Sequence, residues 1–176
     1  MDDLRKLADL IRQRNDLEVE ITRIIQRPAQ VGHIGEFIAA KVFGIALAFS
    51  ASEKGSDGRF EEGPLKDRTV NVKWYAKRAD VLDIEPRFVP DFYLVLTGPH
   101  EPALSSRGTT RPWLITSVFL FDGPRLVDEL AKAGVKIGIG ASVRTYLWDA
   151  AELWPNQRNA MFLLADEQRR MLRLFG

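Results

Sequence analysis

The stretch Thr69–Lys77 constrains the fold more than any other part of the chain. Its apolar residues are Val70, Val72, Trp74 and Ala76, and the polar residues between them are Asn71, Lys73, Tyr75 and Lys77. Successive side chains of a strand point to opposite faces of a sheet, so this alternation predicts a strand with one apolar and one polar face. The apolar face packs into a core, and the polar face is either exposed to solvent or lines a site.

Further strands are predicted on both sides of this stretch. Asp91–Leu96 is almost wholly apolar, which is expected for a strand of a sheet that is covered on both faces. Turn composition in Ser52–Ser56 and Glu62–Asp67 brackets a short strand at Asp57–Phe60, so a hairpin should join that strand to Thr69–Lys77. The remaining candidates are a buried strand or extended linker at Ile45–Phe49, a buried strand at Trp113–Phe121 and a short edge strand at Val135–Ile139.

Helices are predicted between these strands. Gly35–Gly44 has a helical pattern and a glycine stop, and Pro124–Ala133 begins with proline and stops before Gly134. Asn156–Phe175 should form a last helix, with arginines near its C-terminal end where cations suit the helix dipole. The fold class is therefore α/β, with a central mixed sheet flanked by helices, and 176 residues suit one such domain with a short appendage.

The appendage is the N-terminal segment. From Asp3 to Gln26, apolar residues recur at helical spacing with charges between them, and Pro28 ends the pattern. We therefore divide the chain into a helical arm, residues 1–30, and a domain, residues 31–176. The arm is interpreted as an amphipathic helix that packs on the domain, or as an arm that forms a homodimer or binds a partner protein.

Composition excludes several classes of site. The chain has no cysteine, so disulfides, cysteine-based zinc sites and thiol nucleophiles are absent. No apolar run approaches the roughly 20 residues of a membrane span, and the N-terminus lacks an apolar signal segment, so we expect a cytoplasmic protein with no membrane partner. The net charge of +1 gives no general attraction to nucleic acid, so any phosphate-binding surface must come from local clustering of charge.

Three chemically useful groups follow one another along the chain. Glu36 lies in a predicted helix, Asp57 follows a turn, and Lys73 lies on the polar face of the central strand with Asn71 two residues before it. Oxygen ligands of this kind can hold Mg²⁺ or Mn²⁺, and such a cation acidifies water and stabilises charge on a phosphate. A neighbouring lysine can orient the water or offset phosphate charge, so phosphodiester hydrolysis is a sensible chemistry for this set.

These residues resemble the motifs of the PD-(D/E)xK phosphodiesterase superfamily, which includes many restriction endonucleases. The resemblance covers roughly residues 31–96 and extends to a group of small bacterial proteins of this type. It is carried by Gly32-His33-Ile34-Gly35-Glu36, Ser56-Asp57-Gly58 and Val70-Asn71-Val72-Lys73-Trp74-Tyr75. It implies a restriction endonuclease-like core and a metal-dependent phosphodiesterase acting on DNA, with Mg²⁺ or Mn²⁺. It further implies that Glu36 and Asp57 are metal ligands and that Lys73 is the catalytic lysine.

The sequence departs from that superfamily at Asn71, where an acid is usual. An amide oxygen can ligate Mg²⁺ but brings no charge, so metal affinity should fall. Asn71 or the Val72 carbonyl would complete the metal shell, and Glu61 is an auxiliary acid that could compensate. A catalytically weakened nuclease-fold module that binds nucleic acid or protein is therefore the alternative function, and a structural protein without nucleic-acid contact is a third.

Further residues are candidates for contacts with nucleic acid. They are Tyr75, Lys77, Arg59, Arg107 and Arg111. The arginines and lysine would contact phosphates, and Tyr75 would contact a sugar or base unless it is an ordinary hydrogen-bonded core tyrosine. His33, three residues before Glu36, would assist the metal or phosphate, or serve as a capping or packing residue.

Overall fold

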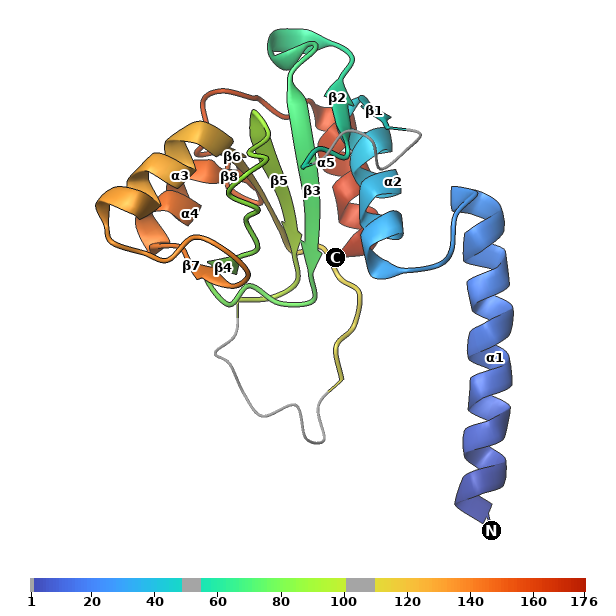
Figure 1. Cartoon of the computed structure of the whole chain (residues 1–176). Helices are drawn as coiled ribbons and strands as arrows, with labels where there is room; N and C mark the ends of the chain where they lie inside the picture. Colours follow the sequence, from blue (N-terminus) through green and yellow to red (C-terminus); the bar gives the residue numbers. More distant parts are fainter. Residues whose placement is uncertain (1, 49–54, 101–109) are drawn as a thin grey trace.

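The computed structural model describes residues 2–48, 55–100 and 110–176, which form an α/β fold around a six-stranded mixed sheet (Figure 1). The helices are α1 (Asp2–Ile25), α2 (Val31–Phe43), α3 (Gly123–Lys132), α4 (Thr145–Ala151) and α5 (Asp166–Leu172), with short 3-10 helices η1 (Gly63–Leu65) and η2 (Arg173–Phe175). The strands are β1 (Ile45–Leu47), β2 (Gly58–Phe60), β3 (Thr69–Tyr75), β4 (Val81–Leu82), β5 (Phe92–Thr97), β6 (Ser117–Asp122), β7 (Ala141–Ser142) and β8 (Glu152–Trp154).

The main sheet has the strand order β1-β2-β3-β5-β6-β8. β3 and β5 pair in parallel, with Asn71 opposite Tyr93 and Lys73 opposite Val95, and the other neighbouring pairs are antiparallel. β4 and β7 form a separate small ladder. The predicted central strand is thus confirmed as β3, the predicted hairpin as the β2–β3 pair, and the predicted apolar strand as β5.

Helices cover both faces of the sheet. α2 and α5 lie over one face, where their side chains pack on Val72 and Leu94, and α3 and α4 lie over the other, with Trp148 at the centre of that core (Figure 1). Each face of β5 therefore packs against apolar side chains, and all six residues of the strand are buried. This explains the continuous apolar character of the segment.

Helix α2 lies close to β3 because a glycine faces the strand. A Cβ atom built on Gly35 would lie 3.1 Å from Trp74 Cβ, so the helix could not approach this tightly with a larger residue there. The helix ends as predicted at Gly44, which has a φ of 63° and donates its backbone N–H to the Ala40 carbonyl. The close approach places the neighbouring Glu36 beside the central strand.

The predicted helix at Asn156–Phe175 is wrong over its first half, because α5 begins only at Asp166. Side-chain amides hold residues 156–165 in an irregular path instead. The buried Asn159 donates its Nδ2 to the Leu120 carbonyl, and Gln157 donates its Nε2 to the carbonyls of Asn159 and Phe162. Amide side chains that bond to the backbone compete with helix formation, which the apolar spacing alone does not reveal.

Other boundaries also differ from the predictions. Val135–Ile139 forms no strand, and the short strand lies instead at β7, while the predicted strand at Trp113–Phe121 begins only at Ser117. The helix α4 and the edge strand β8 were not predicted, since both are short. The predicted helix at Pro124–Ala133 is confirmed as α3, with the Asp122 carboxylate accepting from the Arg125 amide at its N-terminus.

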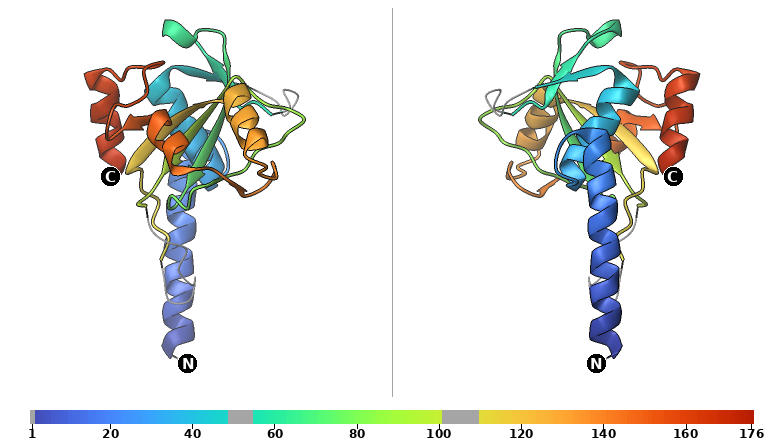
Figure 2. Two further views of the ribbon diagram at one scale, coloured as in Figure 1. Left: turned by 90° about the vertical axis from the view of Figure 1, so that its left-hand side faces the viewer. Right: turned by 90° about the vertical axis from the view of Figure 1, so that its right-hand side faces the viewer.

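Helix α1 confirms the predicted N-terminal helix but not its packing on the domain. It projects away from the sheet and its covering helices (Figures 1 and 2). Ile25 is its one buried residue among the described residues, and most of its large apolar side chains are exposed. Neither α1 nor any other helix in residues 2–48, 55–100 and 110–176 combines the length and apolar character needed to cross a membrane.

Asp91 joins the beginnings of β3 and β5. Its Oδ2 accepts from both the backbone N–H and the hydroxyl of Thr69 at 2.8 Å, and its own N–H donates to the Thr69 hydroxyl oxygen. Burial raises the pKa of Asp91, but the two bonds from Thr69 and the charges of Arg68 and Arg59 outweigh it. The pKa therefore lies below the usual 3.8.

We expect Asp91→Ala to lower the free energy of unfolding at neutral pH by about 1–3 kcal/mol, because Thr69 loses a charged hydrogen-bond acceptor. A depressed folded pKa contributes stability above the unfolded pKa of 3.8, and this contribution is lost as the pH falls through the folded value. Urea unfolding of both proteins from neutral pH downward should therefore show their difference shrinking in acid. An equal difference at every pH would contradict this account.

Candidate functional site

The candidate site begins where β3 loses its backbone partner on one side. β2 pairs with β3 only at Gly58–Val70 and Arg59–Thr69, and the Asp57 N–H then donates to the Val70 carbonyl. The next backbone donor along this edge, the Val72 N–H, is taken by the Asp57 carboxylate, with 2.6 Å between Val72 N and Asp57 Oδ2. The hairpin therefore places a carboxylate on the edge of the central strand.

Asp57 is surrounded by other charges. Burial raises the pKa of its carboxyl, the bond from the Val72 amide lowers it, the negative charge of Glu36 raises it, and the positive charges of Lys73 and Arg27 lower it. The net direction is upward from the usual 3.8. The structure thus brings together Glu36, Asp57 and Lys73, the three residues that the sequence singled out for chemistry, and it adds Arg27.

Glu36 reaches the site from α2, and Arg27 reaches it from the connection between α1 and α2. The Glu36 side chain is only 16% exposed and forms an ion pair with the Arg27 guanidinium. Sequence reasoning missed Arg27. The only available signal was its position, a lone cation between the two helices, and that does not identify a partner.

Asn71 and Lys73 project from the other face of β3. They alternate with Val70 and Val72, which pack on the α2 side, so Asn71 and Lys73 lie on the face that also carries Tyr93 and Val95. Asp57 stands at the strand edge between the two faces. The site therefore wraps around this edge, with Glu36 approaching from one face and Lys73 from the other.

Four buried polar side-chain atoms lack hydrogen-bond partners within the described part of the chain. They are Asn71 Oδ1, the Tyr93 hydroxyl and Thr97 Oγ1 on this face, and Trp148 Nε1 in the core that covers it. A buried oxygen without a partner is unfavourable by roughly 1–3 kcal/mol, so its retention needs an explanation. An oxygen ligand waiting for a cation or a water is one explanation that fits Asn71.

The oxygen atoms around Asp57 suit the expected cation, Mg²⁺ or Mn²⁺. Glu36, Asp57 and Asn71 offer carboxylate and amide oxygens, which are the hard ligands that Mg²⁺ and Mn²⁺ prefer. A carboxylate has about four lone-pair sites, so Asp57 can keep its bond to Val72 and still ligate a metal. No group of three or more His, Cys, Asp or Glu side chains that could hold a metal ion occurs among the described residues, so this donor set depends on the amide of Asn71.

Lys73 is available for chemistry. In the described residues its ammonium forms no salt bridge, although it lies close enough to lower the pKa of Asp57. A half-buried lysine on a rigid strand, beside carboxylates but not tied to one of them, can contact a water or a phosphate. The Val72 carbonyl remains a predicted metal ligand, since the bond to Asp57 uses only the Val72 amide.

The auxiliary candidates have other contacts. His33 Nδ1 lies 3.0 Å from the Pro28 carbonyl oxygen, as expected for a capping contact, and this contact does not involve Nε2. Glu61 is exposed just beyond the end of β2, and its charge is not among those that act on Asp57. The structure therefore does not bring Glu61 to the position left by the missing acid.

The candidate contacts with nucleic acid are scattered. The Tyr75 hydroxyl accepts from the Asp83 amide at 3.0 Å, and burial raises its pKa to about 12, as for a hydrogen-bonded core tyrosine. Arg59 is exposed and donates to the Asp67 carbonyl, Lys77 is half-buried just beyond β3, and Arg111 is exposed. Arg107 lies outside the described residues.

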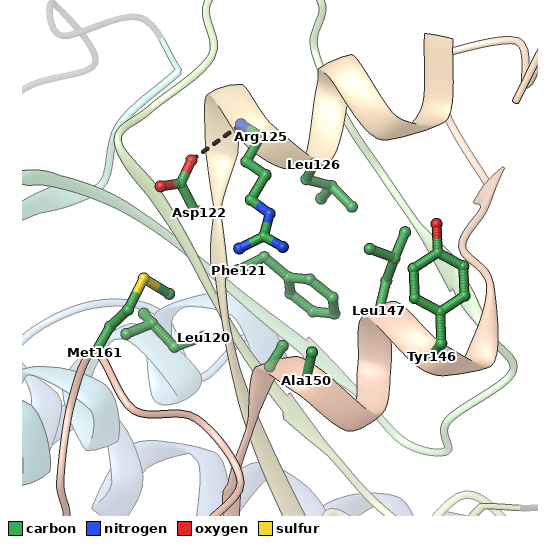
Figure 3. A pocket seen from close by; sticks show the side chains of 10 residues that line it. Leu120, Phe121, Asp122, Arg125, Leu126, Tyr146, Leu147, Ala150 and Met161 are labelled. Atoms are coloured by element: carbon green, nitrogen blue, oxygen red, sulfur yellow. Dashed lines mark hydrogen bonds between the residues drawn. The ribbon is translucent and has the colours of Figure 1, made fainter. Parts of the chain in front are cut away.

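Pockets among the described residues lie on either side of the sheet. One opens beside the start of β3, where Ser56, the neighbour of Asp57, lies with Arg59, Thr69 and Arg87, so its wall is partly basic. The other lies between α3 and α4 and is lined mainly by apolar side chains, with Asp122 bonded to the backbone of Arg125 (Figure 3). The first adjoins the candidate site, whereas the second holds no pair of groups suited to acid–base chemistry.

Comparison with known proteins gives no matching protein-family model and no match among curated proteins. The residues around Asp57 are therefore the basis for inferring a function.

We expect Asp57→Asn to raise the melting temperature of the metal-free protein at neutral pH. The pKa of Asp57 in the folded protein lies above 3.8, so ionisation of this carboxyl disfavours the folded state. The natural protein therefore loses stability as the pH rises through the folded pKa, and regains it in acid. An amide keeps an acceptor for the Val72 N–H. A rise of about 2–4 °C would correspond to about 1 kcal/mol for a chain of this size.

The matched control is Asp16→Asn on the exposed part of α1, which should leave the melting temperature unchanged. The gap between Asp57→Asn and the natural protein should close below pH 3.8, where the carboxyl is protonated in both states. A lower melting temperature for Asp57→Asn at neutral pH would show that the ionised carboxylate is stabilising.

Proposed function

We propose that this chain is a phosphodiesterase that acts on DNA and depends on Mg²⁺ or Mn²⁺, with a restriction endonuclease-like core. The observation that carries the proposal is the environment of Asp57. A half-buried carboxylate is fixed at a strand edge within range of a second carboxylate and a lysine, and an unpartnered amide oxygen lies on the same strand as the lysine. Residues that serve only folding have no need for such a set.

The order of elements supports the same proposal. A helix carrying Glu36 is followed by a hairpin carrying Asp57, then by the central strand with Asn71 and Lys73, and then by the parallel neighbour β5. This is the order that the resemblance to PD-(D/E)xK proteins implies. The mixed sheet covered by helices on both faces is compatible with such a core.

Each residue has a chemical role in this proposal. Glu36, Asp57 and Asn71 Oδ1 would hold the cation, which supplies positive charge for the phosphate and acidifies a water. The Lys73 ammonium would orient that water and offset charge developing on the phosphate. The bond from the Val72 amide keeps the Asp57 carboxylate in one position, so the ligand set is organised before substrate arrives.

A second candidate is a nuclease-fold module that binds nucleic acid or protein with weakened catalysis. Two observations favour it. The residue at the usual second acid is Asn71, which adds no negative charge, and Glu36 is already paired with Arg27. A cation must compete with the Arg27 guanidinium for Glu36, so the site should bind metal weakly.

We expect the protein to cleave plasmid DNA in Mg²⁺ or Mn²⁺ and not in chelator. Lys73→Ala should reduce the cleavage rate by about 100-fold or more, since a positioned general acid–base group contributes 10²–10⁴-fold. The matched control is Lys66→Ala, which removes an exposed lysine outside the site and should cleave normally. Single-stranded DNA is tested in parallel.

The outcomes separate the two candidates. Metal-dependent cleavage that is lost in Lys73→Ala supports the enzyme. Salt-sensitive DNA binding without cleavage supports the module, because phosphate contacts release counterions and weaken as salt rises. Equal cleavage by Lys73→Ala and Lys66→Ala would remove Lys73 from the mechanism.

We further expect Asn71→Asp to tighten metal binding, because it restores a carboxylate beside Asp57 and Glu36. The Mn²⁺ concentration that half-saturates the rise in melting temperature should fall about tenfold, equivalent to about 1.4 kcal/mol. Asn15→Asp on α1 adds the same charge far from the site and should not shift the titration. An unchanged midpoint for Asn71→Asp would argue against a cation at this position.

A further inference from the structure

In the described part of the chain, most of the apolar surface of helix α1 is left uncovered. The helix spans 24 residues, or about 36 Å at 1.5 Å per residue, and stands clear of the domain along most of its length (Figures 1 and 2). Seven of its large apolar side chains are heavily exposed, from 49% for Ile11 and Val19 to 69% for Leu4, whereas Ile21 is half-buried and Ile25 is buried. Helices in water depend largely on packing of their apolar face, so an isolated helix of this kind needs something to cover it.

The spacing of these residues is that of a coiled coil. Leu7, Leu10, Arg14, Leu17, Ile21 and Ile24 follow one another at alternating steps of three and four residues. This is the a/d pattern of a heptad repeat, with Leu7, Arg14 and Ile21 at a and Leu10, Leu17 and Ile24 at d. The pattern is continuous along the helix apart from Arg14. We name these six residues the seam.

We propose that the seam binds the seam of a second copy of this chain, so that two α1 helices pair antiparallel as the dimer interface. In this arrangement Leu7 packs on Ile24 of the second copy, Leu10 packs on Ile21, and Arg14 lies beside Leu17. Apolar residues therefore meet at both ends of the paired helices, and Arg14 meets Leu17 at the centre. The seam is therefore self-complementary.

Charge selects the antiparallel orientation. In a parallel pair the two Arg14 side chains would meet at one a layer, and like charges at close range are unfavourable. In the antiparallel pair each Arg14 faces the level of Leu17 and Glu18 of the other copy. Arg14 already lies 2.9 Å from Glu18 of its own chain, so two arginines and two glutamates form a neutral group at the centre of the dimer.

The same charges argue for a second copy rather than an unrelated helix. A wholly apolar partner would cover the Arg14–Glu18 ion pair in the middle of the seam without offering it a polar group, and covering charged groups in this way is unfavourable. A second copy brings a matching Glu18 to the centre and apolar residues to both ends. This proposal concerns the arm alone and does not rest on the proposed nuclease function.

The first test measures the mass of the full chain by sedimentation equilibrium. The natural protein should have twice the chain mass of 19.9 kDa, and Leu17→Lys should return it to a monomer by placing a cation in the seam. The matched control is Val19→Lys, which adds the same charge at an exposed apolar residue on the opposite side of α1 and should stay dimeric. A monomeric natural protein, or a dimeric Leu17→Lys, would overturn the proposal.

The second test fixes the orientation, and the absence of natural cysteine makes it direct. Leu7→Cys and Ile24→Cys proteins are oxidised separately and as a mixture. Antiparallel pairing predicts a disulfide dimer that contains one chain of each kind and forms only in the mixture. If Leu7→Cys alone forms disulfide dimers as readily as the mixture does, the helices pair in parallel, and this result would contradict the antiparallel arrangement.

Discussion

The bond between the Asp57 carboxylate and the Val72 amide organises the region around the candidate site. It continues the hairpin ladder beyond Gly58, the first residue of β2, and uses a side chain where a strand would use its backbone. It thereby fixes a negative charge at the open edge of the central strand. The positions of Glu36, Lys73 and Arg27 matter chemically because their charges all act on this one carboxylate.

This arrangement is unfavourable for a protein that only has to fold. Burial raises the pKa of Asp57, Glu36 adds a like charge, and Asn71 Oδ1 is buried without a partner among the described residues. An apolar residue in place of Asn71 would avoid the last of these penalties. These charged and unpartnered groups around Asp57 are the basis of the proposed site.

The sequence predicted the parts of this region that follow local rules. Alternation along Thr69–Lys77 identified β3 and the shared face of Asn71 and Lys73, and the glycine stop identified the end of α2. It could not predict Arg27, because an ion pair between a connection and a helix leaves no periodic pattern. It was wrong for residues 156–165, where the contacts of Asn159 and Gln157 with distant backbone decide the path. Both failures concern tertiary contacts.

The same distinction applies to α1. Its apolar spacing predicted a helix, but spacing alone does not say which surface covers the apolar side chains. The structure shows that the domain does not cover most of them. It also shows that the arm and the site are physically connected, since Arg27 follows α1 almost directly and pairs with Glu36. Because the Arg27 charge lowers the pKa of Asp57, any change in how the end of α1 sits on the domain changes the electrostatic balance at the central strand.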